Sequence, residues 1–198
     1  ACPSGVPFAE MHNTARGKYV QDEQPFSVKK IRNRILANYR TSARIASKLP
    51  RTANFFMNNG AVRWLMEKTM KIPSEREFPT FATKTFREWW ADRGGAHVQS
   101  EDKRVAYFHG CYSNFNTTKV AKAMVRTYEE LGYEIIVPKQ KCSGTPMFAY
   151  GRLDDARRHA EVNVEHLGNA IEEGYDVIAT CSSGSLALRQ EYPELFDI

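Results

Sequence analysis

Three short apolar segments of this chain each lead to a cysteine, and this feature constrains the fold more than any other. The segments are 104–109, 133–138 and 175–180, and the cysteines that follow them are Cys111, Cys142 and Cys181. Each segment is rich in β-branched or aromatic residues and is flanked by Gly or Pro, which favours a strand over a helix. The sequence therefore predicts three strands, with a thiol at or just beyond the end of each.

Two segments of helical length, 117–131 and 151–173, separate the three strands. Each is followed by a glycine suited to a helix C-cap, Gly132 or Gly174. Strands joined by helices run parallel through right-handed crossovers. The predicted fold class is α/β, with a small parallel sheet of β-α-β-α-β units. Because parallel strands end at one edge of the sheet, where such sheets bind ligands, we expect the three cysteines to converge although 30 and 38 residues separate them.

The composition fits a globular protein in a reducing environment. The chain has 198 residues, enough for one domain and an extension, and its 42% hydrophobic and 26% charged residues are ordinary for a soluble protein. We find no signal peptide and no apolar run of the roughly 18–20 residues that cross a bilayer. Four cysteines are too few for a disulfide scaffold and are more often metal ligands or reactive thiols. We therefore expect a cytoplasmic location.

The positive charge is concentrated in residues 27–71. This segment has eleven Lys or Arg and one acidic residue, Glu67, although the whole chain has a net charge of only +5. Apolar residues at helical spacing predict a basic amphipathic helix from Ser27 that Pro50 ends, and a second helical segment over 53–71. Two interpretations stand side by side: peripheral docking on the anionic inner face of the cell membrane, or packing against another domain. We expect no nucleic-acid partner, because no recognised binding motif accompanies the charge.

These features divide the chain into four parts. We expect an N-terminal part, residues 1–26, in which 8–24 form a short amphipathic helix followed by a polar stretch. Basic helices over 27–71, a linker over 72–103 and the α/β domain over 104–198 should follow. The linker carries aromatic residues that should be buried against the sheet domain, namely Phe81, Phe86, Trp89 and Trp90.

The N-terminal pair Cys2-Pro3 fits the close of a ferredoxin-type ligand run, because Cys-Pro ends the pattern C-x₂-C-x₂-C-x₃-C-P. On this interpretation Cys2 binds a [4Fe-4S] cluster whose other ligands would precede residue 1, and residues 1–26 are the tail of a ferredoxin-type module. The alternative is an N-terminal loop with an incidental Cys-Pro pair.

Three converging thiols suit a soft metal centre. Thiolates bind zinc or iron–sulfur clusters, so Cys111, Cys142 and Cys181 are candidate metal ligands. His109, two residues before the first of them, is a candidate fourth ligand or a histidine satisfied at a strand end. Two alternatives stay open: the cysteines are small buried apolar residues, or the start of a helix at Ser182 binds an anion. No Ser/His/Asp set is placed for nucleophilic catalysis.

The motifs around these residues resemble the cysteine-rich CCG family, whose pattern is a Cys after the first strand, Cys-Cys-Gly after the second and Cys-x-x-Cys after the third. The segments that carry the resemblance are 109–112, 141–147, 177–193, 78–82, 85–89 and 1–6. The family includes iron–sulfur subunits of heterodisulfide reductase, of glycolate and lactate oxidases and of anaerobic glycerol-3-phosphate dehydrogenase. The last branch, with its relatives, is the most similar.

The resemblance implies an electron-transfer subunit that has no substrate pocket of its own. Such a subunit passes electrons from a flavoprotein dehydrogenase subunit, through [4Fe-4S] clusters, toward membrane quinone or another acceptor. It also implies a tandem ferredoxin module before this chain and a second cysteine-rich repeat after it. The rival interpretations are a heterodisulfide-reductase or hydroxyacid-oxidase subunit, and a non-redox scaffold that docks on the membrane.

The chain departs from the family pattern at two positions. Ser143 stands where the second Cys of Cys-Cys-Gly is expected, and Gly184 stands where the last Cys of Cys-x-x-Cys is expected. Three of the five thiolates remain, so this degenerate repeat would bind zinc, an incomplete cluster or no metal.

Overall fold

The computed structural model describes residues 8–21 and 27–198. The helices that precede the sheet are α1 (Phe8–Gln21), α2 (Val28–Ala37), α3 (Tyr39–Ala46), α4 (Pro50–Asn58), α5 (Gly60–Met70) and α6 (Phe86–Asp92). The sheet domain follows with β1 (Arg104–Phe108), α7 (Gly110–Phe115), α8 (Thr118–Glu130), β2 (Glu134–Ile136), α9 (Thr145–Ala149), α10 (Leu153–Glu172) and β3 (Asp176–Ala179). The chain then forms α11 (Ser182–Leu186), a π-helical turn (Ala187–Glu191) and α12 (Tyr192–Phe196).

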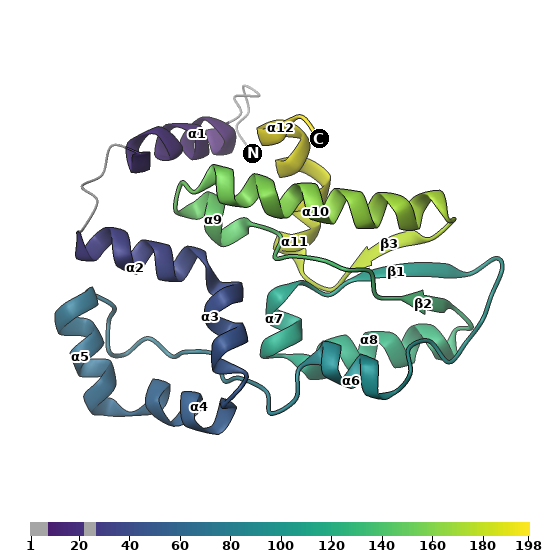
Figure 1. The fold of residues 1–198 in the computed structure, drawn as a ribbon, viewed down its shortest axis with the longest axis horizontal. Coiled ribbons are helices and arrows are strands. Elements are labelled where there is room, and N and C mark those ends of the chain that lie inside the picture. Colours follow the sequence, from purple (N-terminus) through teal and green to yellow (C-terminus); the bar gives the residue numbers. More distant parts are fainter. Residues whose placement is uncertain (1–7, 22–26) are drawn as a thin grey trace.

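The sheet has the strand order β2-β1-β3, and β1 pairs in parallel with both neighbours. Helices cover both faces of the sheet, with α10 on one face and α6 and α8 on the other (Figure 1). The alternation of side chains along β1 matches these two faces. Val105 and Tyr107 pack in one cluster with residues of α6 and α8, whereas Ala106 packs with Ala170 of α10. The structure therefore confirms the predicted α/β class with a small parallel sheet.

The main elements of the sheet domain lie where the sequence predicted them. The two long helices, α8 and α10, begin and end within two residues of the predicted segments, and β1, β2 and β3 lie inside the three apolar runs. Gly132 and Gly174 follow these helices in the left-handed region, with φ values of 81° and 87°. Glycine adopts this conformation without the steric cost that a Cβ imposes, which is why it ends a helix well.

The prediction for the basic segment was wrong in its boundaries. The helix expected from Ser27 to Pro50 is two helices, because α2 ends at Ala37 and is followed by Asn38, whose side-chain amide donates to the Arg34 carbonyl at 2.9 Å. Pro50 does not end a helix but begins α4, a position where its missing N–H costs nothing. The segment expected over 53–71 is likewise split at Asn59, whose side chain caps the start of α5.

The linker holds a helix that the sequence analysis missed. Thr85 and Glu88 form a capping box that starts α6 within the predicted linker. The aromatic residues of this segment are buried as predicted, because Phe86 is fully buried, Phe81 is nearly so, and Trp89 and Trp90 pack partly buried in the same cluster as Phe86. This helix therefore fastens the linker to the face of the sheet that α8 also covers.

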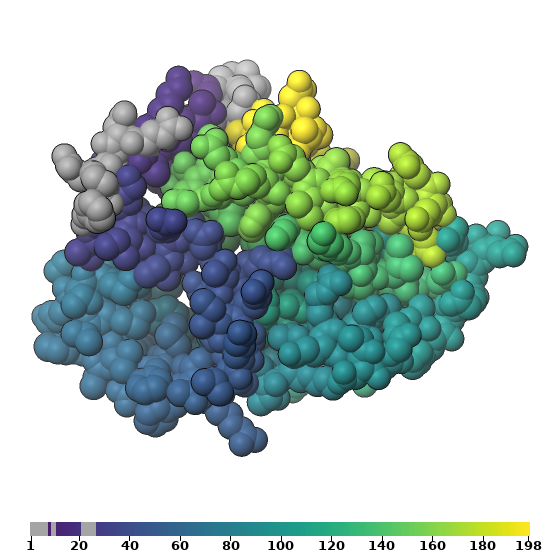
Figure 2. All heavy atoms as spheres, in the orientation of Figure 1, coloured from purple at the N-terminus to yellow at the C-terminus, as the bar shows by residue number. Residues whose placement is uncertain are grey.

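The basic helices lie against the sheet domain through their small residues. Ala37 of α2 packs with Met147 and Phe148 of α9, and Ala43 of α3 packs with Phe115 of α7. In Figure 2 these helices form the blue side of the molecule, next to the teal and green sheet domain. Nine large apolar side chains of the same segment stay exposed: Val28, Ile31, Ile35, Ile45, Leu49, Phe55, Phe56, Trp64 and Leu65. None of the helices in the described part of the chain is long and apolar enough to cross a membrane.

Replacing Phe86 with Ala should destabilise the protein strongly, because the ring is fully buried between Tyr107, Trp89 and Trp90. We expect the free energy of unfolding to fall by about 3–5 kcal/mol, as measured by urea denaturation. Phe55→Ala is the matched control, because Phe55 is 65% exposed and its loss should change the free energy by less than about 0.5 kcal/mol. Equal effects of the two substitutions would contradict the assigned packing of α6.

Candidate metal centre

The three predicted ligand cysteines lie just beyond the C-terminal ends of the three strands. Cys111 is the second residue of α7, which follows β1 directly, and Cys181 is the residue before α11. Cys142 lies in the loop between β2 and α9. Gly110 makes the turn from β1 into α7 with a φ of 66°, a conformation that favours glycine. Because β1 pairs in parallel with β2 and β3, these three positions share one edge of the sheet.

Two of the thiols form a direct pair. A hydrogen bond between Cys111 and Cys142 is the main cause of opposite pKa shifts, because it lowers the pKa of Cys142 and raises that of Cys111. Burial raises the pKa of Cys111 further, and the backbone N–H of Gly144 helps to lower that of Cys142. The pair therefore favours a thiolate on Cys142 and a proton on Cys111.

The third thiol stands somewhat apart from this pair. The sulfur of Cys181 lies 3.2 Å from the hydroxyl oxygen of Ser183. Cys181 is still near enough to Cys111 to contribute, as a minor cause, to the raised pKa of that thiol. Within residues 8–21 and 27–198, no three His, Cys, Asp or Glu side chains are grouped closely enough to hold a metal ion. A site for one ion bound by all three thiolates is therefore not preformed. That Cys111, Cys142 and Cys181 are metal ligands stays a prediction.

His109 lies in the aromatic core beside this edge. Its ring contacts the rings of Phe86 and Tyr107 edge-on, at centroid distances of 5.3 and 6.2 Å, and Nδ1 donates to the Gly110 carbonyl. Burial lowers the pKa of His109 to about 3, so the imidazole is neutral, and its Nε2 atom is buried without a hydrogen-bond partner. A neutral imidazole nitrogen with a free lone pair suits metal ligation, and the role of His109 as a fourth ligand stays a prediction.

The two positions that depart from the family pattern lie at this edge as well. Ser143 is buried, and its hydroxyl lies 3.1 Å from that of Thr145, as expected of a residue that stabilises a turn. Gly184 lies on α11, and a Cβ built there would be 3.5 Å from the Cβ and 3.7 Å from the sulfur of Cys181, with a ring carbon of Phe108 at 3.2 Å. A cysteine at position 184 would therefore border Cys181 directly.

A buried polar network that the sequence analysis missed holds the second cysteine loop. Asn163 of α10 is fully buried, and its side chain accepts the backbone N–H of Lys141 at 2.7 Å and donates to the Cys142 carbonyl at 3.3 Å. It also contacts the hydroxyl of Tyr192, which donates to the Ser143 carbonyl at 2.9 Å. An asparagine on the apolar face of a helix was the available signal, because a buried amide needs partners.

A second buried amide connects the first and second cysteine loops. The side chain of Gln140 accepts the backbone N–H of Gly110 at 3.2 Å and donates to the Tyr107 carbonyl at 3.1 Å. Gln140 precedes Cys142 by two residues, and Gly110 precedes Cys111 by one. One side chain therefore fixes the backbone on both sides of the thiol pair. No local pattern in the sequence marks this residue.

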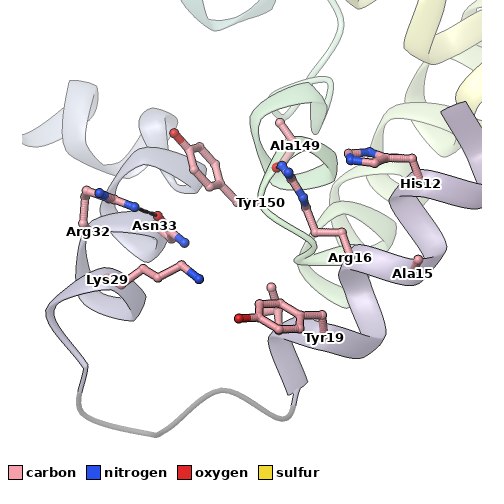
Figure 3. Close-up of a pocket in the computed structure, with 10 residues that line it drawn as sticks. His12, Ala15, Arg16, Tyr19, Lys29, Arg32, Asn33, Ala149 and Tyr150 are labelled. Carbon is pink, nitrogen blue, oxygen red and sulfur yellow. Dashed lines mark hydrogen bonds between the residues drawn. The ribbon is translucent and has the colours of Figure 1, made fainter. Parts of the chain in front are cut away.

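A basic cleft of about 470 Å³ lies away from the cysteines, between α1 and α2. Figure 3 shows its labelled residues, among them His12, Arg16, Tyr19, Lys29, Arg32 and Tyr150. Arg16 donates to the carbonyl of Ala149, the last residue of α9, and Arg32 donates to the carbonyl of Met70, the last residue of α5, at 3.3 Å. These cations satisfy the free carbonyl groups of two helix ends. We therefore interpret the cleft as a structural contact between helices and assign no ligand to it.

The helix predicted to begin at Ser182 is α11, which has five residues and starts directly after Cys181. Both polar groups of Ser183 have partners within the protein. Its carbonyl accepts a hydrogen bond from the Thr145 hydroxyl at 3.4 Å, and its hydroxyl contacts the sulfur of Cys181. Cys2, the predicted ligand of a ferredoxin-type cluster, lies outside the described residues.

The parallel sheet and its cysteine-bearing edge define a cysteine-rich α/β class of domain, and comparison with known proteins agrees. Residues 105–189 match the family CCG, described as a cysteine-rich domain, which confirms the resemblance that the motifs predicted for the sheet domain. Over 198 residues the chain is 32% identical to a subunit of the anaerobic glycerol-3-phosphate dehydrogenase of Escherichia coli strain K12, an alignment that covers 99% of this chain and 48% of that protein.

Other relatives match about half of the chain. It is 35% identical over 97 residues to a subunit of the fumarate reductase (CoM/CoB) of Methanothermobacter marburgensis, which covers 48% of this chain and 19% of that protein. It is 32% identical over 94 residues to "Lactate utilization protein A" of Geobacillus thermodenitrificans, which covers 47% of this chain and 37% of that protein. No solved structure matches the chain. The chain spans about half the length of the Escherichia coli relative that it matches.

Replacing Asn163 with Ala should destabilise the protein and loosen the second cysteine loop. The substitution leaves the Lys141 N–H, the Cys142 carbonyl and the Tyr192 hydroxyl short of a partner. We expect the free energy of unfolding to fall by about 2–4 kcal/mol, since each unsatisfied buried group costs on the order of 1–3 kcal/mol. Asn169→Ala, at an exposed position of the same helix, is the control and should have little effect in thermal or urea unfolding. A loss as large in the control would contradict the role given to this network.

Proposed function

We propose that this chain is part of an iron–sulfur electron-transfer subunit of an anaerobic glycerol-3-phosphate dehydrogenase-like complex. The observation that carries the proposal is the placement of three thiols at one edge of a parallel sheet, in a chain that is similar over nearly its whole length to a subunit of that enzyme. The subunit receives electrons from a flavoprotein subunit that oxidises glycerol 3-phosphate, and passes them toward membrane quinone.

The residues at the sheet edge fit a thiolate-bound group by their chemistry. The thiol pair favours a thiolate on Cys142, and Cys111 packs with apolar residues of α3 and α7, among them Ala43 and Phe115. Cys111, Cys142 and Cys181 would hold a zinc ion or an incomplete iron–sulfur cluster, with His109 as a nitrogen ligand, while Cys2 would belong to a [4Fe-4S] cluster of a ferredoxin-type module. An iron–sulfur cluster accepts and releases single electrons, and apolar surroundings exclude water from it.

A second candidate function keeps the electron transfer but changes the partner. The relatives that match about half of the chain are named as a fumarate reductase subunit and a lactate utilization protein, so the cysteine-rich domain type occurs beside several dehydrogenases or reductases. The subunit would then serve a heterodisulfide-reductase-like or hydroxyacid-oxidising complex. The flavoprotein that co-purifies with the protein, and the substrate that reduces it, distinguish the two candidates.

The exposed apolar residues of the basic helices support peripheral docking on the inner face of the cell membrane. The net positive charge of residues 27–71 exceeds that of the whole chain, yet large apolar side chains such as Phe55, Phe56 and Trp64 remain more than half exposed on them. A basic segment is drawn to anionic lipid, and exposed aromatic residues insert at the interface. The packing of Ala37 and Ala43 on the sheet domain leaves this outer side of the helices available.

Restoring the two thiols missing from the family pattern should strengthen cluster binding. We expect anaerobic reconstitution with iron and sulfide to give the visible absorbance of an iron–sulfur cluster, to lose it in Cys142→Ala, and to gain intensity and stoichiometry in the double variant Ser143→Cys, Gly184→Cys. The physical reason is the position of Gly184, where a new side chain would border the sulfur of Cys181 after a shift of a few tenths of an ångström in the Phe108 ring.

Gly168→Cys is the control for an added thiol, because a Cβ at this glycine of α10 meets no atom within 4 Å. It should leave iron uptake unchanged. Iron uptake that is the same with and without Cys142, or that rises equally with Gly168→Cys, would count against a thiolate centre at the sheet edge.

Charge reversal on the basic helices should abolish most membrane binding. We expect the protein to co-sediment with anionic vesicles, and Arg34→Glu, Arg44→Glu, Lys48→Glu to release it, since each basic residue near an anionic surface contributes about 1 kcal/mol. Binding should weaken as salt rises, because the Debye length is about 10 Å at 0.1 M. Reversal of three exposed basic residues on the sheet domain, Lys119, Arg126 and Arg189, is the control. Equal release by both triple variants, or equal binding to neutral vesicles, would contradict docking through residues 27–71.

A further inference from the structure

The helical extension contributes a cation to the cysteine-bearing edge. Arg40 of α3 donates from Nη1 to the backbone carbonyl of Gln140 at 2.8 Å, although 100 residues separate the two in sequence. The helix is held in this place by Ala43, which is fully buried against Phe81 and Phe115, and by a hydrogen bond from the Tyr39 hydroxyl to Asn116. The position of the guanidinium is therefore fixed by packing.

The partner of Arg40 is the residue that joins the two cysteine loops. Gln140 is 4% exposed, and its side chain holds the backbone of Gly110 beside Cys111, while its own backbone leads into Cys142. Arg40 thus holds the main chain of Gln140, and Gln140 holds the loop of the neighbouring strand. These contacts connect the basic helices to the loops that carry the thiol pair.

The charge of Arg40 has a natural counter-charge in the thiolates. Within the described residues Arg40 forms no ion pair with a carboxylate, and its one hydrogen bond goes to a neutral carbonyl. A partly buried cation is costly unless a negative charge lies near it. The guanidinium contacts the backbone carbonyl two residues before Cys142, so the thiolates are the negative charges to which its position brings it near.

We propose that Arg40 is a positioning residue of the thiolate centre: through Gln140 it sets the two cysteine loops relative to each other, and its charge stabilises the anionic thiolate-bound centre. The inference rests on the proposed function, because it presupposes that these thiolates hold a metal. It makes the basic helices part of the site as well as a surface. It also predicts the sign of an effect on the reduction potential. A cation beside a cluster favours the state with one more electron, so removing the charge of Arg40 should lower the reduction potential of the centre.

The test measures Co²⁺ affinity from the thiolate-to-cobalt absorption of the purified, metal-free protein under anaerobic conditions. We expect Arg40→Gln to weaken Co²⁺ binding by about 10–100-fold, the usual effect of removing a group that supports the ligands. Arg40→Lys, which keeps the charge, should recover part of the affinity. Arg44→Gln, one turn further along the same helix and exposed, removes an equal charge and should leave the affinity unchanged. Circular dichroism verifies that each variant is folded.

A second readout is the reduction potential of the centre after reconstitution with iron and sulfide, which should be more negative in Arg40→Gln than in the wild type or in Arg44→Gln. If folded Arg40→Gln binds Co²⁺ as tightly as the wild type and has the same potential, the inference is overturned while the metal centre stands. If Arg44→Gln weakens binding as much as Arg40→Gln, the effect is general surface charge and the inference is also overturned. If the wild type gives no thiolate-to-cobalt absorption, the proposed function fails and this inference fails with it.

Discussion

The parallel pairing of β1 with strands on both of its sides is the constraint on which the rest of this structure depends. Because β1 pairs with β2 and with β3 in the same direction, the chain must leave all three strands at one edge. The crossover helices α8 and α10 then cover opposite faces of the sheet (Figure 1), and the edge itself is left for loops. Three of the four cysteines follow these strand ends. The parallel pairing therefore sets the position of the core and also the position of the candidate metal centre.

The edge is completed by two helices from outside the sheet domain and by two buried amides within it. Two alanines, Ala37 and Ala43, allow α2 and α3 to approach α9 and α7 closely, because a methyl group lets two backbones come near each other without leaving a void. Buried amides of Gln140 and Asn163 then satisfy backbone groups of the cysteine loops, which no strand or helix could pair. Loops with this many fixed hydrogen bonds are rigid supports for the thiols they carry.

The sequence predicted the parts of this arrangement that depend on neighbours along the chain. Strand-like runs, helix-length segments and the closing glycines Gly132 and Gly174 are local signals, and they placed the sheet and its cysteine edge correctly. Helices α7 and α9 escaped prediction because five or six residues are too short to show a helical period. Arg40 and Gln140 escaped because their contacts join residues 30 to 100 positions apart, and such contacts leave no trace in a local pattern. Asn163 was missed as well, although an amide on the apolar face of α10 was a local signal that could have indicated a buried network.

The late position of β3 in the chain sets the order in which the edge is built during synthesis. Tyr107 on β1 and Thr180 just after β3 share a hydrogen bond of 2.7 Å, yet they are 73 residues apart. Cys111 and Cys142 can meet once β2 has paired with β1, whereas Cys181 is made 39 residues after Cys142, a delay on the order of seconds at roughly 5–20 residues per second. A nascent chain therefore passes through a stage with two thiols in contact and the third still unmade. A group that needs all three thiolates can therefore be loaded only after Cys181 has been made.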